Sequence, residues 1–183
     1  MRELYQMKLH LWQLCKNQST TIAFGTQAGG AFGKYYFEQH RSANSEDMFG
    51  VGEHLPSTPT GSSATAASVK RGLIWYQQAT RISWYLNGTY EQVDGKTMPN
   101  DCVFKLAFDV EAGSVWVGYN DQWLDSSKNP TASFTEGSPT FSGLDLKNCL
   151  TIHRAPPSSA NGAVVNFGQQ PFVYTPPAGF EAL

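Results

Sequence analysis

The clearest pattern of hydrophobic and polar positions lies in residues 102–110. The even-numbered positions of this segment are all apolar, whereas its odd-numbered positions include Lys105 and Asp109. An alternation with a period of two is typical of a β-strand that places one face on a core. The alternation resumes in residues 114–119, after a short segment with Gly113 that is suited to a turn. The two segments together predict a β-hairpin.

A second hairpin is predicted around the Asn87-Gly88 pair, because these residue types tolerate the positive φ angles of a tight type I′ turn. Residues 81–86 and 89–93 would supply its two strands. Strand character is also found in residues 34–38, 48–52 and 163–167. No segment of ten or more residues other than 3–14 carries a helical stripe. The pattern therefore predicts an all-β fold.

Composition agrees with this prediction and narrows the possible functions. Charged residues make up only 15% of the chain against the roughly 25% usual in soluble domains, and 17 Gly, 10 Pro and 13% aromatic residues favour short strands and many turns. The net charge is −2, and Lys70-Arg71 is the only adjacent basic pair, so we expect no nucleic-acid partner. No window of about 18 apolar residues exists, so we expect no membrane insertion.

Three loop-like segments separate the predicted strands. They are residues 54–68, 120–142 and 154–162, and they are rich in Ser, Thr, Pro, Gly and other polar residues. Many recognition proteins carry long variable loops of this kind on a rigid sheet scaffold. We therefore expect any binding surface to lie in these loops.

Four motifs resemble those of the SPRY (B30.2-like) family, and they follow the family's order along about 150 residues. They are GKYYFE at 33–38, FGVG at 49–52, AFDVEAGSVW at 107–116, and NFGQQPF at 166–172 with its continuation YTPPAGF at 174–180. The resemblance implies a two-sheet antiparallel β-sandwich with long loops that binds proteins or glycans. The physical roles of these residues are those of a scaffold. Phe167, Phe172 and Phe180 are expected to anchor the Pro-rich tail over the sandwich.

Residues 118–123 and 141–144 are similar to a further pattern, NGxW…FxGL, of SPRY domains in phage and bacterial surface proteins. Asp121 stands where that pattern has Gly. This resemblance implies a virion component assembled in the host cytoplasm: a head decoration, a head fibre or a tail-fibre tip. Its partner would be a virion subunit, a host surface protein or a surface glycan, and homo-oligomers are possible. The alternative is a cytoplasmic adaptor that recognises a short peptide.

No motif of a known catalytic type is present, such as G-x-S-x-G, H-E-x-x-H or a P-loop. Cys102 falls on the apolar face of a predicted strand and is interpreted as a core thiol. The charged pairs Glu46-Asp47 and Glu53-His54 lie near strand ends and are interpreted as solvated loop charges. The sequence predicts a non-enzymatic module without catalytic residues or cofactors.

One loop carries several hard oxygen ligands of the kind that calcium prefers. They are Asn120, Asp121, Asp125, Ser126 and Asn129. A calcium-dependent lectin is therefore a further alternative. The EF-hand spacing is absent, and a polar surface turn explains the same residues, so the prediction is that no metal is bound.

The candidate binding residues are aromatic side chains in or beside loops, together with the polar pair at one turn. Trp and Tyr offer a large rigid contact area with a polar tip, which favours recognition. The candidates are Trp75, Tyr76, Tyr90, Asn120, Asp121 and Trp123. Trp84 and Tyr85 point to opposite faces of one predicted strand, so only one of them needs to be exposed.

The sandwich domain is expected to span residues 8–183, with residues 1–7 as an N-terminal arm. Residues 8–14 are favoured as a strand that closes the sandwich. The alternative is a helix or arm that anchors the module to a partner subunit.

Overall fold

The computed structural model describes residues 33–41, 48–52, 72–77, 81–87, 89–96, 98–99, 101–146, 151–155 and 164–182. The predictions for residues 1–14 and for the loop at 54–68 lie outside these ranges, as does most of the loop at 154–162. Within the described ranges every regular element is a strand, and none is a helix that could cross a membrane.

The strands include every predicted segment within these ranges. They are β1 (Lys34–Arg41), β2 (Met48–Gly52), β3 (Gly72–Gln77), β4 (Arg81–Leu86), β5 (Thr89–Asp94), β6 (Cys102–Asp109), β7 (Ser114–Tyr119), β8 (Gln122–Leu124), β9 (Pro130–Thr131), β10 (Thr151–Ala155), β11 (Val164–Asn166) and β12 (Glu181–Ala182). Of these, β3, β8, β9, β10 and β12 were not predicted.

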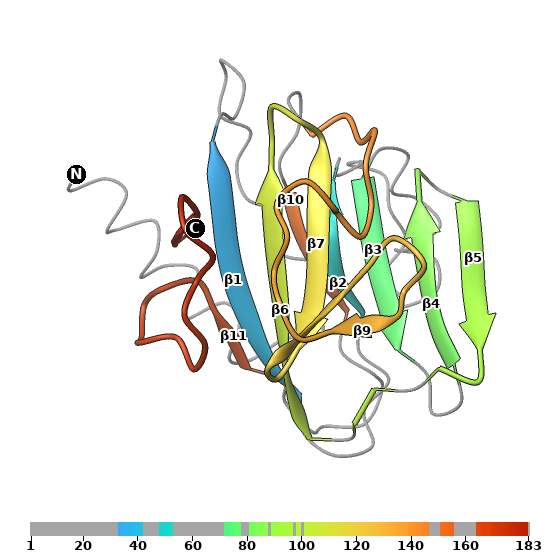
Figure 1. The fold of residues 1–183 in the computed structure, drawn as a ribbon, viewed down its shortest axis with the longest axis horizontal. Helices are drawn as coiled ribbons and strands as arrows, with labels where there is room; N and C mark the ends of the chain where they lie inside the picture. The colour runs from blue at the N-terminus through green and yellow to red at the C-terminus, as the bar shows by residue number, and fades with distance from the viewer. Residues whose placement is uncertain are drawn as a thin grey trace.

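These strands form two sheets that pack face to face. The first sheet has the order β11-β1-β6-β7-β8-β9, with β12 also paired to β1, and the second has the order β10-β2-β3-β4-β5. Strands β2 and β10 lie behind β6 and β7 in Figure 1. All pairings are antiparallel except the short one between β1 and β12. The predicted all-β, two-sheet antiparallel β-sandwich is confirmed.

Both predicted hairpins are present. Asn87 has φ 49° at the turn between β4 and β5, as an Asn-Gly turn requires. Gly113 has φ 61° at the turn between β6 and β7, and a Cβ atom there would lie 2.1 Å from the carbonyl oxygen of Leu144. Only glycine fits this position, because the backbone of residue 144 passes directly over it and its N–H donates to the carbonyl of Gly113 at 3.0 Å.

The main core lies between the two sheets. The even-numbered residues of β6 point into it together with Val115 and Val117 of β7, as the alternation predicted. The opposite sheet contributes Val51, Leu73, Ile82 and Trp84. Cys102 is a buried free thiol in this core, which agrees with its interpretation as a core residue.

The other face of β6 differs from the prediction. The alternation with Lys105 and Asp109 predicted one face on a core, but Lys105 is only 3% exposed and every residue of β6 except Asp109 is buried. The reason is a second layer of chain on the outer face of the first sheet. It consists of the loop at residues 125–140 and the C-terminal tail at residues 167–180, which meet where the rings of Phe134 and Phe180 lie 5.5 Å apart.

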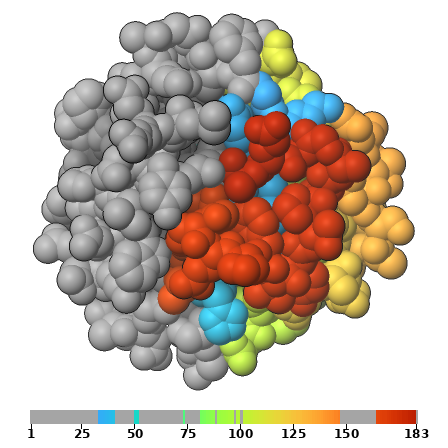
Figure 2. All heavy atoms as spheres, turned by 90° about the vertical axis from the view of Figure 1, so that its left-hand side faces the viewer, coloured from blue at the N-terminus to red at the C-terminus, as the bar shows by residue number. Residues whose placement is uncertain are grey.

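Two of the three Phe residues of the C-terminal tail anchor it over the sandwich as predicted. Phe172 and Phe180 pack on the outer face of the first sheet, whereas Phe167 enters the core between the sheets, 5.5 Å from Phe37. Figure 2 shows the tail spread across the side of the molecule beside β1. Strands β11 and β12, which lie on either side of the tail in the sequence, complete the second edge of β1. Strand β12 pairs with Tyr35 and Tyr36, and β11 pairs with residues 38–40.

Candidate functional site

The outer face of the first sheet carries a compact aromatic cluster. Its buried members are Tyr36, Ala107, Trp116, Trp123 and Phe180, and Phe134 and Phe172 pack against them. Ring centroids lie 5.1 Å apart for Trp123 and Phe134 and 4.9 Å apart for Tyr36 and Phe172. Edge-to-face contacts at these distances stabilise aromatic pairs. The cluster joins strands β1, β6, β7 and β8 to the loop and tail that cover them.

A buried carboxylate holds the tail on this face. Glu38 of β1 is 2% exposed, and it accepts hydrogen bonds from the backbone N–H groups of Val173 and Tyr174, each at 2.8 Å. The hydroxyl of Tyr36 also donates to Glu38 at 2.8 Å. Burial and the neighbouring carboxylate raise the pKa of Tyr36 far above its usual range, so its hydroxyl stays a donor.

Lys105 is the cation beneath the same tail. It lies opposite Glu38 in the pairing of β1 with β6, and its ammonium lies 4.4 Å from the ring centroid of Trp123 and 4.9 Å from that of Tyr174. Burial lowers the pKa of Lys105 to about 8, while the charges of Asp121 and Glu38 act in the opposite direction. The two aromatic faces supply part of the stabilisation that water would give an exposed ammonium.

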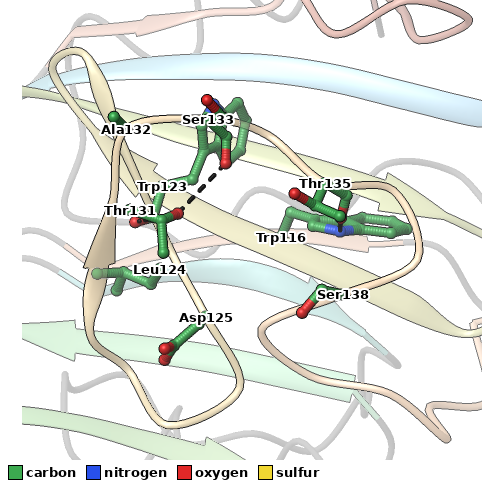
Figure 3. A pocket seen from close by; sticks show the side chains of 9 residues that line it. All are labelled: Trp116, Trp123, Leu124, Asp125, Thr131, Ala132, Ser133, Thr135 and Ser138. Atoms are coloured by element: carbon green, nitrogen blue, oxygen red, sulfur yellow. Dashed lines mark hydrogen bonds between the residues drawn. The ribbon is translucent and has the colours of Figure 1, made fainter.

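A pocket opens beside this cluster, between strands β7 to β9 and the loop that follows them. Its volume is about 300 Å³. Two Trp side chains and Leu124 form its apolar part, and the remainder consists of Asp125 and of small or hydroxyl-bearing residues (Figure 3). The lining residues are Trp116, Trp123, Leu124, Asp125, Thr131, Ala132, Ser133, Thr135 and Ser138.

Hydrogen bonds hold the pocket walls in place. The indole N–H of Trp116 donates to the carbonyl of Thr135 at 3.0 Å, and the hydroxyl of Thr131 is 3.3 Å from the carbonyls of both Trp123 and Ser133. The buried hydroxyl of Thr140 donates to the carbonyl of Leu124 at 2.6 Å. These bonds tie the loop to strands β7 and β8 and so fix the shape of the pocket.

The turn at residues 125–129 is closed by its own side chains. The Asp125 carboxylate accepts from the backbone N–H of Asn129 at 2.8 Å, and this bond lowers the pKa of Asp125 below its usual value. The ammonium of Lys96 donates to the side-chain oxygen of Asn129 at 2.8 Å. In the described part of the chain, no group of three or more His, Cys, Asp or Glu side chains could hold a metal. Of the oxygen ligands considered for calcium, Asp125 and Asn129 are engaged within this turn.

The structure places the three predicted residues of the β7–β8 hairpin in different surroundings. Trp123 lines the pocket and is 8% exposed, so only a small part of its ring is accessible. Asn120 has φ 48° and its side-chain oxygen accepts from the backbone N–H of Val103 at 3.0 Å, which ties the hairpin to β6. Asp121 is exposed at the hairpin tip, where no positive φ is required, so this turn accepts Asp in place of Gly.

The other predicted residues lie in the second sheet. Tyr90 is 42% exposed on β5, its ring is 5.2 Å from that of Tyr85, and its hydroxyl donates to Gln92 at 2.8 Å. Trp75 and Tyr76 lie in β3, and their side chains are outside what the structure describes. The structure therefore does not bring Tyr90 to the pocket that contains Trp123.

Sequence reasoning missed Trp116 and the hydroxyl residues of the pocket. A signal for Trp116 existed, because it alternates with Val115 and Val117 and must therefore point away from the core that they enter. No such signal existed for Thr135 and Ser138. Their positions depend on how the irregular loop folds back over the sheet.

Comparisons with known proteins give matches only among solved structures. No family model and no curated protein matches this sequence. The structure is similar to that of the TRIM65 PSpry domain, with a TM-score of 0.47 and 15% identity over 76% of this chain and 65% of that one. It is similar to the SPRY domain of human HERC1, with a TM-score of 0.39 and 18% identity over 81% of this chain and 82% of that one.

A third similar structure is the Caenorhabditis elegans galectin LEC-6, with a TM-score of 0.36 and 11% identity over 82% of this chain and 91% of that one. The chain spans about two thirds of the TRIM65 PSpry domain. Two of the three structures are SPRY domains, the family that the sequence motifs resemble. The likeness is one of fold.

Proposed function

We propose that this chain is a non-enzymatic binding module that contacts a protein or a glycan through the pocket beneath the loop at residues 125–140. The observation that carries the proposal is the pocket of about 300 Å³, which combines two Trp side chains with a polar rim. Ligand sites are typically concave and partly apolar, with a few placed polar groups that fix orientation.

The lining of the pocket favours binding over catalysis. It contains hydroxyl groups but no His, Cys or Lys, so no base stands beside a hydroxyl nucleophile. The single carboxylate, Asp125, is engaged by the backbone N–H of Asn129. A rigid aromatic and hydroxyl surface of this kind suits recognition.

The test fills the pocket and asks whether binding is lost. Wild-type protein and the variant Ala132→Trp are applied to a printed glycan array and to an array of immobilised peptides. Ala132 is exposed at the pocket wall, so the larger side chain is expected to block the pocket without disturbing the fold. The proposal requires wild-type binding on one array and its loss in the variant.

The variant Gln92→Trp is the control, because residue 92 is exposed on β5 in the other sheet. Circular dichroism and thermal unfolding establish that both variants fold. Binding that survives in Ala132→Trp, or the absence of wild-type binding on both arrays, would contradict the assignment of this pocket.

The finer part of the proposal is that the module is a virion component, such as a head decoration, a head fibre or a tail-fibre tip. Its support is the likeness of residues 118–123 and 141–144 to SPRY domains of phage and bacterial surface proteins. Mass spectrometry of purified particles is expected to find the chain at a fixed ratio to the major capsid protein. A protein found only in the particle-free fraction would overturn this part and leave the pocket assignment untouched.

A further inference from the structure

We infer that the pocket binds the ring of a neutral sugar, one pyranose unit of a glycan. The inference rests on the proposed function and names its ligand class. It follows from four properties of the pocket: its unused hydroxyl groups, its charge, its apolar part and the strand at its edge.

The rim offers hydroxyl groups that the fold does not use. In the described part of the chain, the hydroxyls of Ser133, Thr135 and Ser138 take part in no hydrogen bond, although the backbone carbonyls of Ser133 and Thr135 do. Each hydroxyl can donate one hydrogen bond and accept others. A ligand with several hydroxyl groups of its own matches such a rim, because each partner can act as donor or acceptor.

The charge of the pocket selects against acidic ligands. Asp125 is the one ionisable residue among the nine that line it, and its lowered pKa keeps it ionised near neutral pH. Two cations lie near this carboxylate, and both are held by the loop: the ammonium of Lys96 donates to Asn129 and to the carbonyl of Ser127, and that of Lys128 donates to the carbonyls of Ser126 and Thr140. Neither Lys lines the pocket, so phosphate, sulfate and carboxylate groups would meet the carboxylate of Asp125 there and no cation.

The apolar part gives a sugar ring a narrow strip of carbon to lie against, since Trp116 is 3% exposed and Trp123 is 8% exposed. Trp116 and Trp123 border the pocket, and the polar edge of Trp116 is already bonded to the carbonyl of Thr135. A ligand therefore contacts carbon atoms of these two indole rings. A pyranose ring has C–H groups on its faces and hydroxyl groups around its edge, so it can satisfy an apolar base and a polar rim together.

An extended peptide does not fit this edge of the sheet. Peptides often bind by adding a strand to an exposed sheet edge, where main-chain hydrogen bonds supply the affinity. The strand at this edge is β9, which has only two residues and begins with Pro130, a residue without a backbone N–H. The pocket therefore recognises a compact group, and a volume of about 300 Å³ has room for one sugar ring.

The direct test uses the full chain and simple sugars. Methyl α- and β-glycosides of glucose, galactose and mannose are titrated into the protein while NMR records the indole N–H signals. At least one glycoside is expected to shift the signals of Trp116 and Trp123 with a Kd on the order of 1 mM, which is typical of a few hydrogen bonds and one apolar face. The matching hexuronate is expected to bind at least about tenfold more weakly, because of Asp125.

Two variants examine the rim. In Thr135→Val and Ser138→Ala the hydroxyl is lost, while the backbone carbonyl of residue 135 remains for Trp116. Each is expected to weaken glycoside binding about fivefold, the effect of one neutral hydrogen bond. The matched control is Thr89→Val, whose exposed hydroxyl lies on β5, and it is expected to leave the Kd unchanged.

The outcomes separate this inference from the proposed function. If none of the glycosides binds at 50 mM while peptides bind wild-type protein and not Ala132→Trp, the pocket is a peptide site and the sugar inference is wrong. If the hexuronate binds best, the pocket selects an acidic ligand and the inference of a neutral sugar is wrong. If glycosides bind equally well to Ala132→Trp, both the inference and the pocket assignment fail.

Discussion

The two faces of the first sheet are built on different principles. The inner face meets the second sheet in a core made mainly of aliphatic and Phe side chains from regular strands, such as Leu106 and Val117. The outer face is covered by a loop and a tail, and it combines aromatic rings with a buried carboxylate, Glu38, and a buried cation, Lys105. Because side chains alternate along β6, this strand contributes residues to both the inner and the outer face.

The difference separates the residues that specify the fold from those that can specify a ligand. The inner core depends on the pairing of the strands. A substitution at one buried site disrupts this pairing throughout the domain. The outer cover is irregular chain held by a limited set of hydrogen bonds and ring contacts. Its loop can change in sequence while the sandwich is kept, so it is the region in which a binding specificity can arise.

The largest expected effect distinguishes the two faces directly. Phe104→Ala removes a fully buried ring from the inner core and is expected to lower the free energy of unfolding by about 3–5 kcal/mol. Phe180→Ala removes a buried ring from the outer cluster, where the tail can settle into the space, and we expect a loss of about 2 kcal/mol. Urea unfolding followed by circular dichroism measures both. Equal losses would mean that the outer cover is as integral to the fold as the inner core.

A smaller effect is expected when the tail is loosened. Glu38→Gln replaces one acceptor oxygen by an NH₂ group that faces the backbone donors of Val173 and Tyr174, so at least one of these bonds is lost. The expected cost is about 1.5–3 kcal/mol, and hydrogen exchange at the two amides is expected to quicken. The exposed Glu111→Gln serves as the control. Unchanged exchange at residues 173 and 174 would refute the role of Glu38.

The buried cation predicts a dependence on alkaline pH. The pKa of Lys105 is about 8 in the folded protein and 10.5 when unfolded, so the folded state binds fewer protons between these values and stability rises with pH in that window. From pH 8 to pH 9.5 the rise is about 1–2 kcal/mol. Unfolding of wild-type protein is compared with that of Lys105→Met, since raised tyrosine pKa values affect both proteins alike. Parallel curves for the two proteins would contradict the prediction.

The smallest effect on stability is expected in the pocket itself. Thr135→Val removes an exposed hydroxyl that has no partner within the described residues, so the free energy of unfolding should change by less than about 0.5 kcal/mol. The same urea titration measures it. A loss above 1 kcal/mol would show that this hydroxyl supports the fold, and the variant would then not be a clean test of binding.

The sandwich could be predicted from the sequence because its strands carry local signals. Alternation in residues 102–110 and 114–119 located β6 and β7, and Asn87-Gly88 located the turn of the second hairpin. Such signals depend on neighbours in the chain. The Phe-containing tail was also expected over the sandwich, although one of its rings, Phe167, enters the inner core.

The site was predicted only in part, because it is assembled from segments far apart in the sequence. Trp123 was identified, but as an aromatic in a loop, whereas it is a largely buried residue of β8. The buried state of Lys105 could not be read from β6, since it depends on residues about 70 positions later that fold over it. Contacts of this range leave no periodic trace in a single sequence.

The pairing of β1 on both edges has a consequence for biosynthesis. One edge finds its partner in β6, so it can be completed once residue 109 has left the ribosome. The other edge waits for β11 and β12, which are made last among the described strands. A nascent or truncated chain that lacks residues 164–182 presents an open strand edge and an uncovered aromatic surface, two features that promote aggregation. The second edge of β1 is therefore sealed only after residues 164–182 have been made.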